Sequence, residues 1–200
     1  MLFSDTARLA LGYAHRAEAQ KMPGFDSDVA FELLSRIRQL DWLYDEILQL
    51  EGEYWLLEEK RRGPRPTDTN WINAFVSSGI PKDLEPSLSI EDRLRVLVES
   101  FYYLAHRLLV IVDQCSLGLP GLTTIRAPAV RRVRNNLIEH ANKSGGRVPY
   151  TFSVSNVAGV RLRSVGKVGE PDTFLDNGIH NNAMELRDEL DAMLRSAIAA

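Results

Sequence analysis

Three residues in the second half of the chain carry side chains that can act together on a phosphate ester. The run Arg-Asn-Asn-Leu-Ile-Glu-His spans 134–140 and contains Arg134, Asn135 and His140. A guanidinium stays charged and forks onto phosphate oxygens, whereas an imidazole titrates near neutral pH and can give or take a proton. The asparagine amide can orient either group through hydrogen bonds. This run is therefore the first candidate for a chemically active site.

The spacing within this run sets a geometric condition. On an ideal α-helix, six positions advance about 600°, which leaves the Arg134 and His140 side chains about 120° apart. They converge if the helix loosens before His140, if the long arginine reaches round, or if a partner subunit completes the site. Asn136 and His140 are four positions apart and share a face. The alternative without chemistry is a surface arginine followed by a histidine that favours the C-terminal end of the helix dipole.

Apolar periodicity predicts the elements that would position this run. The apolar face of the first long helix contains Leu33, Ile37, Leu40, Tyr44, Ile47 and Tyr54. A second long helix is apolar around most of its circumference, which predicts a central, nearly surrounded helix. Capping residues are expected at Asp26 or Ser27 for the first and at Ser89 for the second, and Pro128 is expected to start the helix that carries Arg134.

The predicted fold class is mainly α, an antiparallel bundle of four to five helices with a small β-hairpin. The predicted helices cover about 28–59, 68–78, 89–115, 128–144 and 181–197. Residues that alternate between polar and apolar in two short runs predict the hairpin, within about 148–166. We expect one domain over 1–200, because this length suits a single hydrophobic core.

The motif, set in a helical bundle, resembles the HEPN family. The family's motif is an arginine, four to six further residues and a histidine, with a polar residue, often asparagine, directly after the arginine. Arg134, Asn135 and His140 match all three elements. The resemblance covers about 28–142 in architecture and seven residues in motif. It implies a homodimer whose two motifs face each other in a cleft, and active members of the family cut RNA without a metal ion.

The resemblance implies a metal-independent RNA endonuclease without a cofactor, of the kind that serves as a toxin or defence effector, with an antitoxin-type protein as a partner. Arg134 would stabilise charge at the phosphate, His140 would act as acid or base at the ribose 2′-oxygen or the 5′-oxygen, and Asn135 would orient them. One alternative is a non-catalytic HEPN-like dimer that acts as an interaction or nucleotide- or RNA-binding module. Another is a helical bundle with an accidental motif.

Basic residues gather around the motif in a chain whose net charge is −3. The segment 126–167 carries nine basic residues and one acidic residue, Glu139, so its charge is +8 and the rest of the chain is −11. Such a block can attract phosphate. The candidate RNA-binding residues within it are Arg131, Arg132, Arg161 and Arg163. The alternatives are a solvated face and internal pairing with acidic helices.

Polar residues on the second long helix are candidates for supporting the motif. Glu99, Tyr103, His106 and Asp113 are spaced by four, three and seven positions, which places them on one side of this helix. Glu99, Tyr103 and His106 could approach the cleft, although a polar seam that faces solvent or a partner helix is the favoured alternative. Glu99 and His106 could also hold a metal ion, but the sequence offers no third ligand, so we expect no metal site.

Other residues give expectations about compartment and packing. Cys115 is the only cysteine, so no internal disulfide or cysteine-type zinc site is possible. The N-terminus lacks the pattern of a secretory signal and no apolar run is long enough to span a membrane, so we expect a cytoplasmic protein. His15 and His180 are isolated and are expected to lie on the surface. Trp42, Trp55 and Trp71 are expected to anchor packing rather than to stack on bases.

Overall fold

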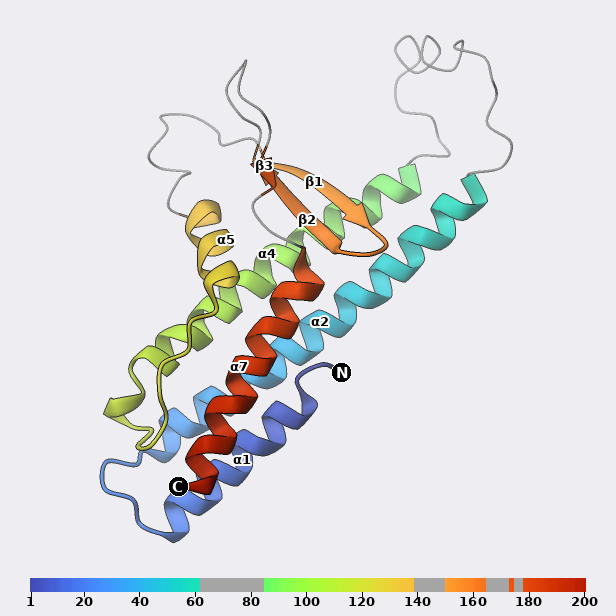
Figure 1. Ribbon diagram of the computed structural model, residues 1–200. Helices are drawn as coiled ribbons and strands as arrows, with labels where there is room; N and C mark the ends of the chain where they lie inside the picture. Colours follow the sequence, from blue (N-terminus) through green and yellow to red (C-terminus); the bar gives the residue numbers. More distant parts are fainter. Residues whose placement is uncertain (62–84, 139–149, 165–172, 175–177) are drawn as a thin grey trace, which may run out of the picture.

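The computed structural model describes residues 1–61, 85–138, 150–164, 173–174 and 178–200. It is mainly helical with a small antiparallel sheet, which confirms the predicted fold class (Figure 1). The helices are α1 (Ser4–Ala19), α2 (Ser27–Arg61), α4 (Glu85–Asp113), the 3-10 turn η1 (Cys115–Leu117), α5 (Pro128–Ile138) and α7 (Ile179–Ala199). The strands are β1 (Tyr150–Ser155), β2 (Gly159–Ser164) and β3 (Thr173–Phe174).

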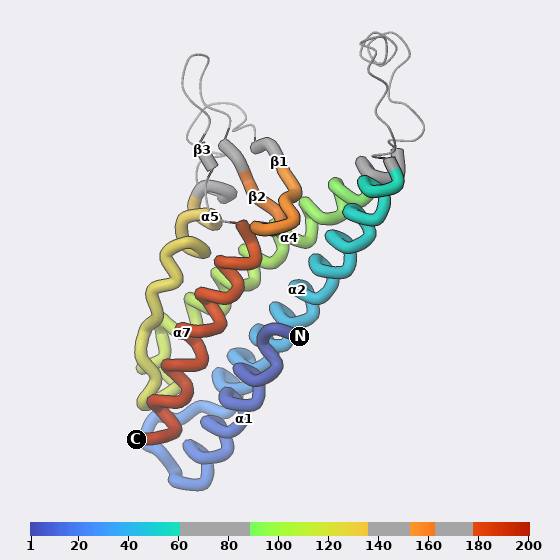
Figure 2. Tube along the Cα trace, turned by 45° about the vertical axis from the view of Figure 1, so that its right-hand side comes forward, coloured from blue at the N-terminus to red at the C-terminus, as the bar shows by residue number. Residues whose placement is uncertain are grey.

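The long helices α2 and α4 run antiparallel, side by side, and form the centre of the bundle (Figures 1 and 2). Helices α1 and α7 pack against each other, and α1 also contacts α2. Helix α5 packs on α4 and contacts α7, while the sheet contacts α7 through β2. The helix that carries Arg134 is therefore held mainly by α4.

The core follows the predicted periodicity on α2. Leu33, Ile37, Leu40, Tyr44 and Ile47 are buried, and they share one face because they recur at steps of three and four. Burying one aliphatic side chain of this size contributes about 1.5–3 kcal/mol. The central position of α2 thus depends on this face.

Helix α4 buries a broad face and leaves one side open. The buried positions are Leu94, Val98, Phe101, Ala105, Leu108, Leu109 and Val112. Leu97, Leu104 and Ile111 are only partly buried, and Val96 and Tyr103 are exposed. The prediction that this helix is nearly surrounded is wrong. The side of α4 that carries Val96 and Tyr103, next to its contact with α2, faces solvent.

Helix α1 was not predicted from the sequence. Its buried stripe consists of Thr6, Ala10, Tyr13 and Ala17, which are mostly small residues. The Thr6 hydroxyl donates to Asp191 Oδ1 at 2.6 Å, which ties α1 to α7. A stripe of alanine and threonine gives little hydrophobic contrast, so periodicity does not reveal it.

The helix starts agree with the sequence in two of three cases. Asp26 Oδ1 accepts from the backbone N–H groups of Asp28 and Val29, at 2.8 and 3.3 Å, as expected for the cap of α2. Helix α5 begins at Pro128 as predicted. Helix α4 begins at Glu85 and not at Ser89, so that predicted start is wrong by one helical turn.

The hairpin is confirmed within its predicted range. Strands β1 and β2 pair antiparallel from Tyr150 opposite Ser164 to Ser155 opposite Gly159. Val160 and Leu162 are buried toward the helices, since side chains two apart on a strand share a face. A short third strand, β3, pairs with β2 and was not predicted.

Some predictions lie outside the described residues. These are the short helix at 68–78, the part of the motif helix beyond 138, and the hairpin margins at 148–149 and 165–166. None of the helices in the described part combines the length and the apolar character needed to cross a lipid bilayer.

Candidate functional site

Arg131 fixes the register of α5 on α4. Its guanidinium donates to both carboxylate oxygens of Asp113, with Nη1 2.9 Å from Oδ2 and Nη2 2.8 Å from Oδ1. Its Nε and Nη2 also donate to the backbone carbonyls of Arg126 and Ile125, at 2.9 and 3.2 Å. Such a bidentate pair adds geometric specificity to the contact. The guanidinium predicted to bind RNA is thus already engaged within the fold, and its contact with RNA stays a prediction.

Arg134 lies one turn beyond Arg131 on α5 and carries the motif's positive charge. Its Nη1 donates to the side-chain oxygen Oδ1 of Asn135 at 3.0 Å. Arg134 is half-buried and Asn135 is exposed. The asparagine is therefore placed to orient the arginine, while His140 lies outside the described residues.

His106 of α4 is the histidine that the structure brings toward Arg134. Helices α4 and α5 run antiparallel, and Arg131 of α5 pairs with Asp113 of α4 (Figure 1). The direction from Arg131 to Arg134 along α5 is therefore the direction from Asp113 back toward His106 along α4. Burial lowers the pKa of the half-buried His106 imidazole most, and nearby positive charges lower it further. These charges belong to Arg134, Arg131 and Arg107, and the Asp113 carboxylate acts in the opposite direction. The imidazole is therefore mainly neutral near pH 7 and can accept a proton.

The other two supporting candidates face a different neighbour. Glu99 and Tyr103 line a groove of about 620 Å³ between α2 and α4, together with Trp42 and Gln39 of α2. The four polar residues of α4 share one broad face of that helix. Within this face His106 and Asp113 lie toward α5, whereas Tyr103 lies toward α2. The predicted polar seam is thus divided between the Arg134 edge and the groove.

The remaining predicted RNA-binding residues lie on α5 and β2. Arg132 is exposed and makes no hydrogen bond or ion pair with the described residues. Arg161 is half-buried and lies opposite Ser153, and Arg163 lies opposite Thr151. The Arg161 side chain lies on the face of the sheet opposite buried Val160 and Leu162, because neighbouring positions on a strand face opposite sides.

His180 is not the surface residue that the sequence suggested. Its Nε2 lies 2.8 Å from Oε2 of buried Glu51, and its Nδ1 lies 2.9 Å from the Tyr44 hydroxyl. Burial raises the pKa of Tyr44 to about 12, so this phenol keeps its proton. The consistent assignment has Tyr44 donating to Nδ1 and Nε2–H donating to the carboxylate. Glu51 Oε1 also accepts from the Val160 N–H at 3.1 Å, which ties β2 to the bundle.

No three His, Cys, Asp or Glu side chains in the described part of the chain are grouped so that they could hold a metal ion. Comparison of the chain with protein-family models, curated proteins and solved structures finds no match in any of the three. The HEPN resemblance therefore rests on the motif residues and stays a prediction.

Proposed function

We propose that the protein is a metal-independent RNA endonuclease of HEPN type. The observation that carries the proposal is the Arg134–Asn135 hydrogen bond on α5, a helix that packs on α4, where positive charges including Arg134 lower the pKa of His106. A guanidinium oriented by a hydrogen bond is prepared to stabilise charge that develops at a phosphate. His140 supplies the motif's imidazole, and we propose that it acts as acid or base in the reaction.

The proposed reaction is transesterification within the RNA chain. The ribose 2′-oxygen attacks phosphorus and loses its proton to a base, while the bond from phosphorus to the 5′-oxygen breaks and that oxygen gains a proton from an acid. The products are a 2′,3′-cyclic phosphate and a free 5′-hydroxyl. The negative charge that builds on the phosphoryl oxygens lies where Arg134 donates.

The test is cleavage of RNA in the presence of EDTA by the wild type and by His140→Ala. We expect cleavage by the wild type to persist with the chelator and to leave a 2′,3′-cyclic phosphate, and we expect His140→Ala to be inactive. His15→Ala is the matched control, because His15 is exposed on α1. Activity that disappears with EDTA, or that survives in His140→Ala, contradicts the proposal.

We also propose a C2 homodimer, because the motif spacing calls for a facing subunit. The chain has a mass of 22.5 kDa. Light scattering at micromolar concentration is expected to give twice this mass, and a species of 22.5 kDa alone would count against the dimer.

The basic residues outside the motif are proposed to bind the RNA backbone. Replacing Arg161 and Arg163 with Ala should weaken RNA binding and flatten its dependence on salt, because fewer phosphate contacts mean that fewer counterions are released on binding. Arg195→Ala, on the exposed side of α7, is the control. Unchanged affinity and unchanged slope would show that these arginines only face solvent.

A second candidate function is a non-catalytic module that binds RNA or a partner protein. The observation that favours it is the open groove between α2 and α4, where Trp42 and Tyr103 are exposed. Binding of RNA without any cleavage by the wild type would support this candidate over the endonuclease. The proposal of a toxin role with an antitoxin-type partner is tested by growth arrest on expression, which should be lost in His140→Ala.

A further inference from the structure

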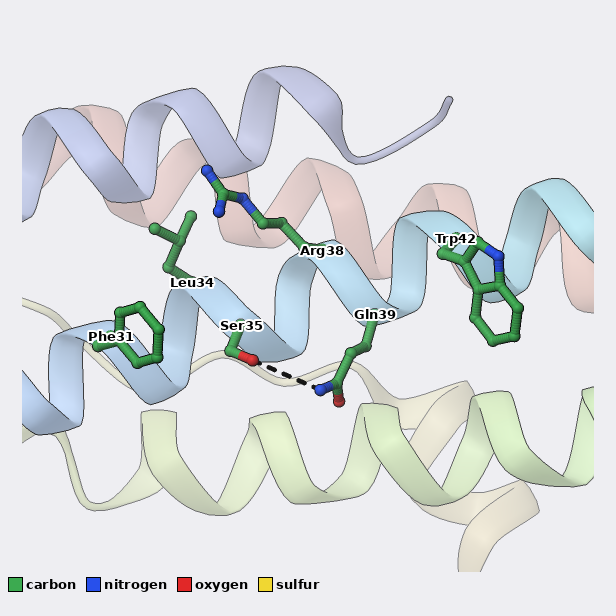
Figure 3. Close-up of a pocket in the computed structure, with 6 residues that line it drawn as sticks. All are labelled: Phe31, Leu34, Ser35, Arg38, Gln39 and Trp42. Carbon is green, nitrogen blue, oxygen red and sulfur yellow. Dashed lines mark hydrogen bonds between the residues drawn. The ribbon is translucent and has the colours of Figure 1, made fainter.

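The groove between α2 and α4 is a second feature of the surface that the motif does not explain. Trp42, Gln39 and Leu43 of α2 line it on one side, and Glu99 and Tyr103 of α4 on the other. Its volume of about 620 Å³ lies within the range of small-molecule sites, about 300–1,000 Å³. Figure 3 shows the adjoining stretch of α2, with Trp42 at one end, α4 beside it and α7 behind it.

The aromatic side chains of this groove are not used by the fold. Trp42 is 60% exposed and Tyr103 is 54% exposed. Neither ring contacts another aromatic ring in the described part of the chain, and neither side chain makes a hydrogen bond there. The buried tyrosines differ, since the hydroxyl of Tyr13 donates to the Pro120 carbonyl and that of Tyr44 to His180. The expectation that Trp42 anchors packing is therefore wrong.

A positive charge lies beside the groove on α4. Arg107 follows Tyr103 by one turn of α4, is exposed and pairs with no carboxylate among the described residues. Arg36 shows the contrast, because its guanidinium is bonded to Glu32. Arg38 precedes Trp42 by one turn of α2, but its side chain points away from α4 (Figure 3). Arg107 is thus a cation available to an anionic ligand at this groove.

The groove itself carries the opposite charge. Glu99 is exposed and makes no hydrogen bond or ion pair in the described part of the chain. A carboxylate repels a phosphate but accepts hydrogen bonds from the N–H groups of a nucleobase edge. Aromatic walls, a carboxylate between them and the Arg107 guanidinium beside them suit a base inside the groove and a phosphate next to Arg107.

The groove also adjoins the proposed catalytic edge. His106 follows Tyr103 by three positions and Arg107 by four, so both lie within one turn of the groove on α4. Helix α5, which carries Arg134, packs on α4, and the Arg134 charge helps to lower the pKa of His106. A nucleotide chain can therefore continue from the groove to the Arg134–Asn135 pair along α4.

We propose that the groove binds one unpaired base of a single-stranded RNA, stacked on Trp42 and Tyr103, with a neighbouring phosphate on Arg107. This inference deepens the proposed endonuclease and rests on it for the identity of the ligand. A duplex keeps its bases stacked and does not present one to the groove. The preferred substrate is thus single-stranded near the cleaved bond.

The test uses a fluorescent RNA hexanucleotide with 2′-O-methyl riboses, which cannot be cleaved by attack of the 2′-oxygen. Its binding is measured by anisotropy for the wild type, Trp42→Ala, Trp42→Phe and Tyr103→Ala. Base stacking on an aromatic ring is large enough that each alanine variant should bind about fivefold more weakly or worse. Trp42→Phe keeps a stacking face and should bind within about twofold of the wild type.

The matched control is Leu56→Ala. Leu56 has the same exposed fraction as Trp42, 60%, and lies on the same helix but about 21 Å along it, outside the groove. This variant should bind as the wild type does. Circular dichroism checks that the exposed substitutions leave the helices folded.

Several results would overturn the base-binding groove. They are unchanged affinity in Trp42→Ala and Tyr103→Ala, an equal loss in Leu56→Ala, and conversion of a dimer to a monomer by Trp42→Ala, which would make the groove a contact between copies. Unchanged binding by these variants, beside normal cleavage by the wild type, overturns the groove and leaves the endonuclease in place. Loss of binding by these variants, beside cleavage that survives His140→Ala, overturns the proposed motif and leaves the groove in place. No binding of the hexanucleotide by the wild type overturns the groove.

Discussion

Glu189 of α7 caps the start of α5, so its replacement should destabilise the protein at the helix that carries Arg134. Its Oε2 accepts from the backbone N–H of Arg126 at 2.6 Å. The Ala127 N–H lies 3.1 Å from each of its carboxylate oxygens. Helix N-termini leave N–H groups without an intrahelical partner, and a negative charge there also favours the helix dipole. The carboxylate therefore acts as a cap supplied from a residue about sixty positions away in the chain.

The expected cost follows from these contacts. Loss of a helix cap costs about 0.5–2 kcal/mol, and hydrogen bonds to a charged group contribute about 1.5–3 kcal/mol. Ala127 is fully buried, so water does not replace the lost partner of its N–H. We expect Glu189→Ala to lower the free energy of unfolding by about 2 kcal/mol, and a domain of this size then melts about 4–8 °C lower. Glu189→Gln keeps one acceptor oxygen and should lose about half as much.

The assay is urea denaturation followed by circular dichroism, with Asp188→Ala as the control. Asp188 is exposed and pairs only with its neighbour Arg187 among the described residues, so its loss should stay within about 0.5 kcal/mol. If Glu189→Ala is no less stable than Asp188→Ala, the carboxylate does not hold α5 and the reasoning is refuted.

Two further predictions concern histidines. His180→Ala leaves the Glu51 carboxylate buried without its imidazole partner, so we expect a loss of about 2–4 kcal/mol in urea denaturation, against almost none for exposed His15→Ala; a loss below about 1 kcal/mol would contradict this. In an NMR titration, His106 should titrate below its ordinary pKa of 6.5, and Arg134→Gln should raise that pKa. An unchanged pKa in the variant would show that the Arg134 charge does not act on His106. Because the folded state holds this imidazole with a lowered pKa, its protonation favours unfolding. This effect is absent above pH 6.5, and it progressively lowers the free energy of unfolding as the pH falls below that value.

Local patterns in the sequence were enough for much of the fold. The α2 face of Leu33, Ile37 and Leu40 has strong hydrophobic contrast, and Pro128 marks the start of α5 through its fixed backbone angle. Helix α1 escaped because alanines such as Ala10 and Ala17 signal little. The start of α4 escaped because the capping pattern at Ser89 recurs inside helices as well as at their ends.

Features that depend on contacts between distant segments could not be read from the sequence. His180 is surrounded by Glu51 and Tyr44, more than 120 positions away, and nothing near it signals that burial. The motif gave Arg134 and Asn135, but their neighbour His106 depends on the register of α5 on α4, which the Arg131 contact sets. Spacing along one helix showed which residues share a face, without showing which helix each of them meets.

The rate of RNA cleavage in EDTA by Arg134→Ala, measured beside its melting temperature, tests the central claim most directly. Removal of one donor aimed at developing charge lowers a rate by about 100-fold or more, whereas loss of a half-buried polar side chain costs about 1 kcal/mol of stability. We expect a rate at least about 100-fold below that of the wild type, with a melting temperature only about 2–4 °C lower. Cleavage at the wild-type rate by a folded Arg134→Ala protein would contradict the proposed site.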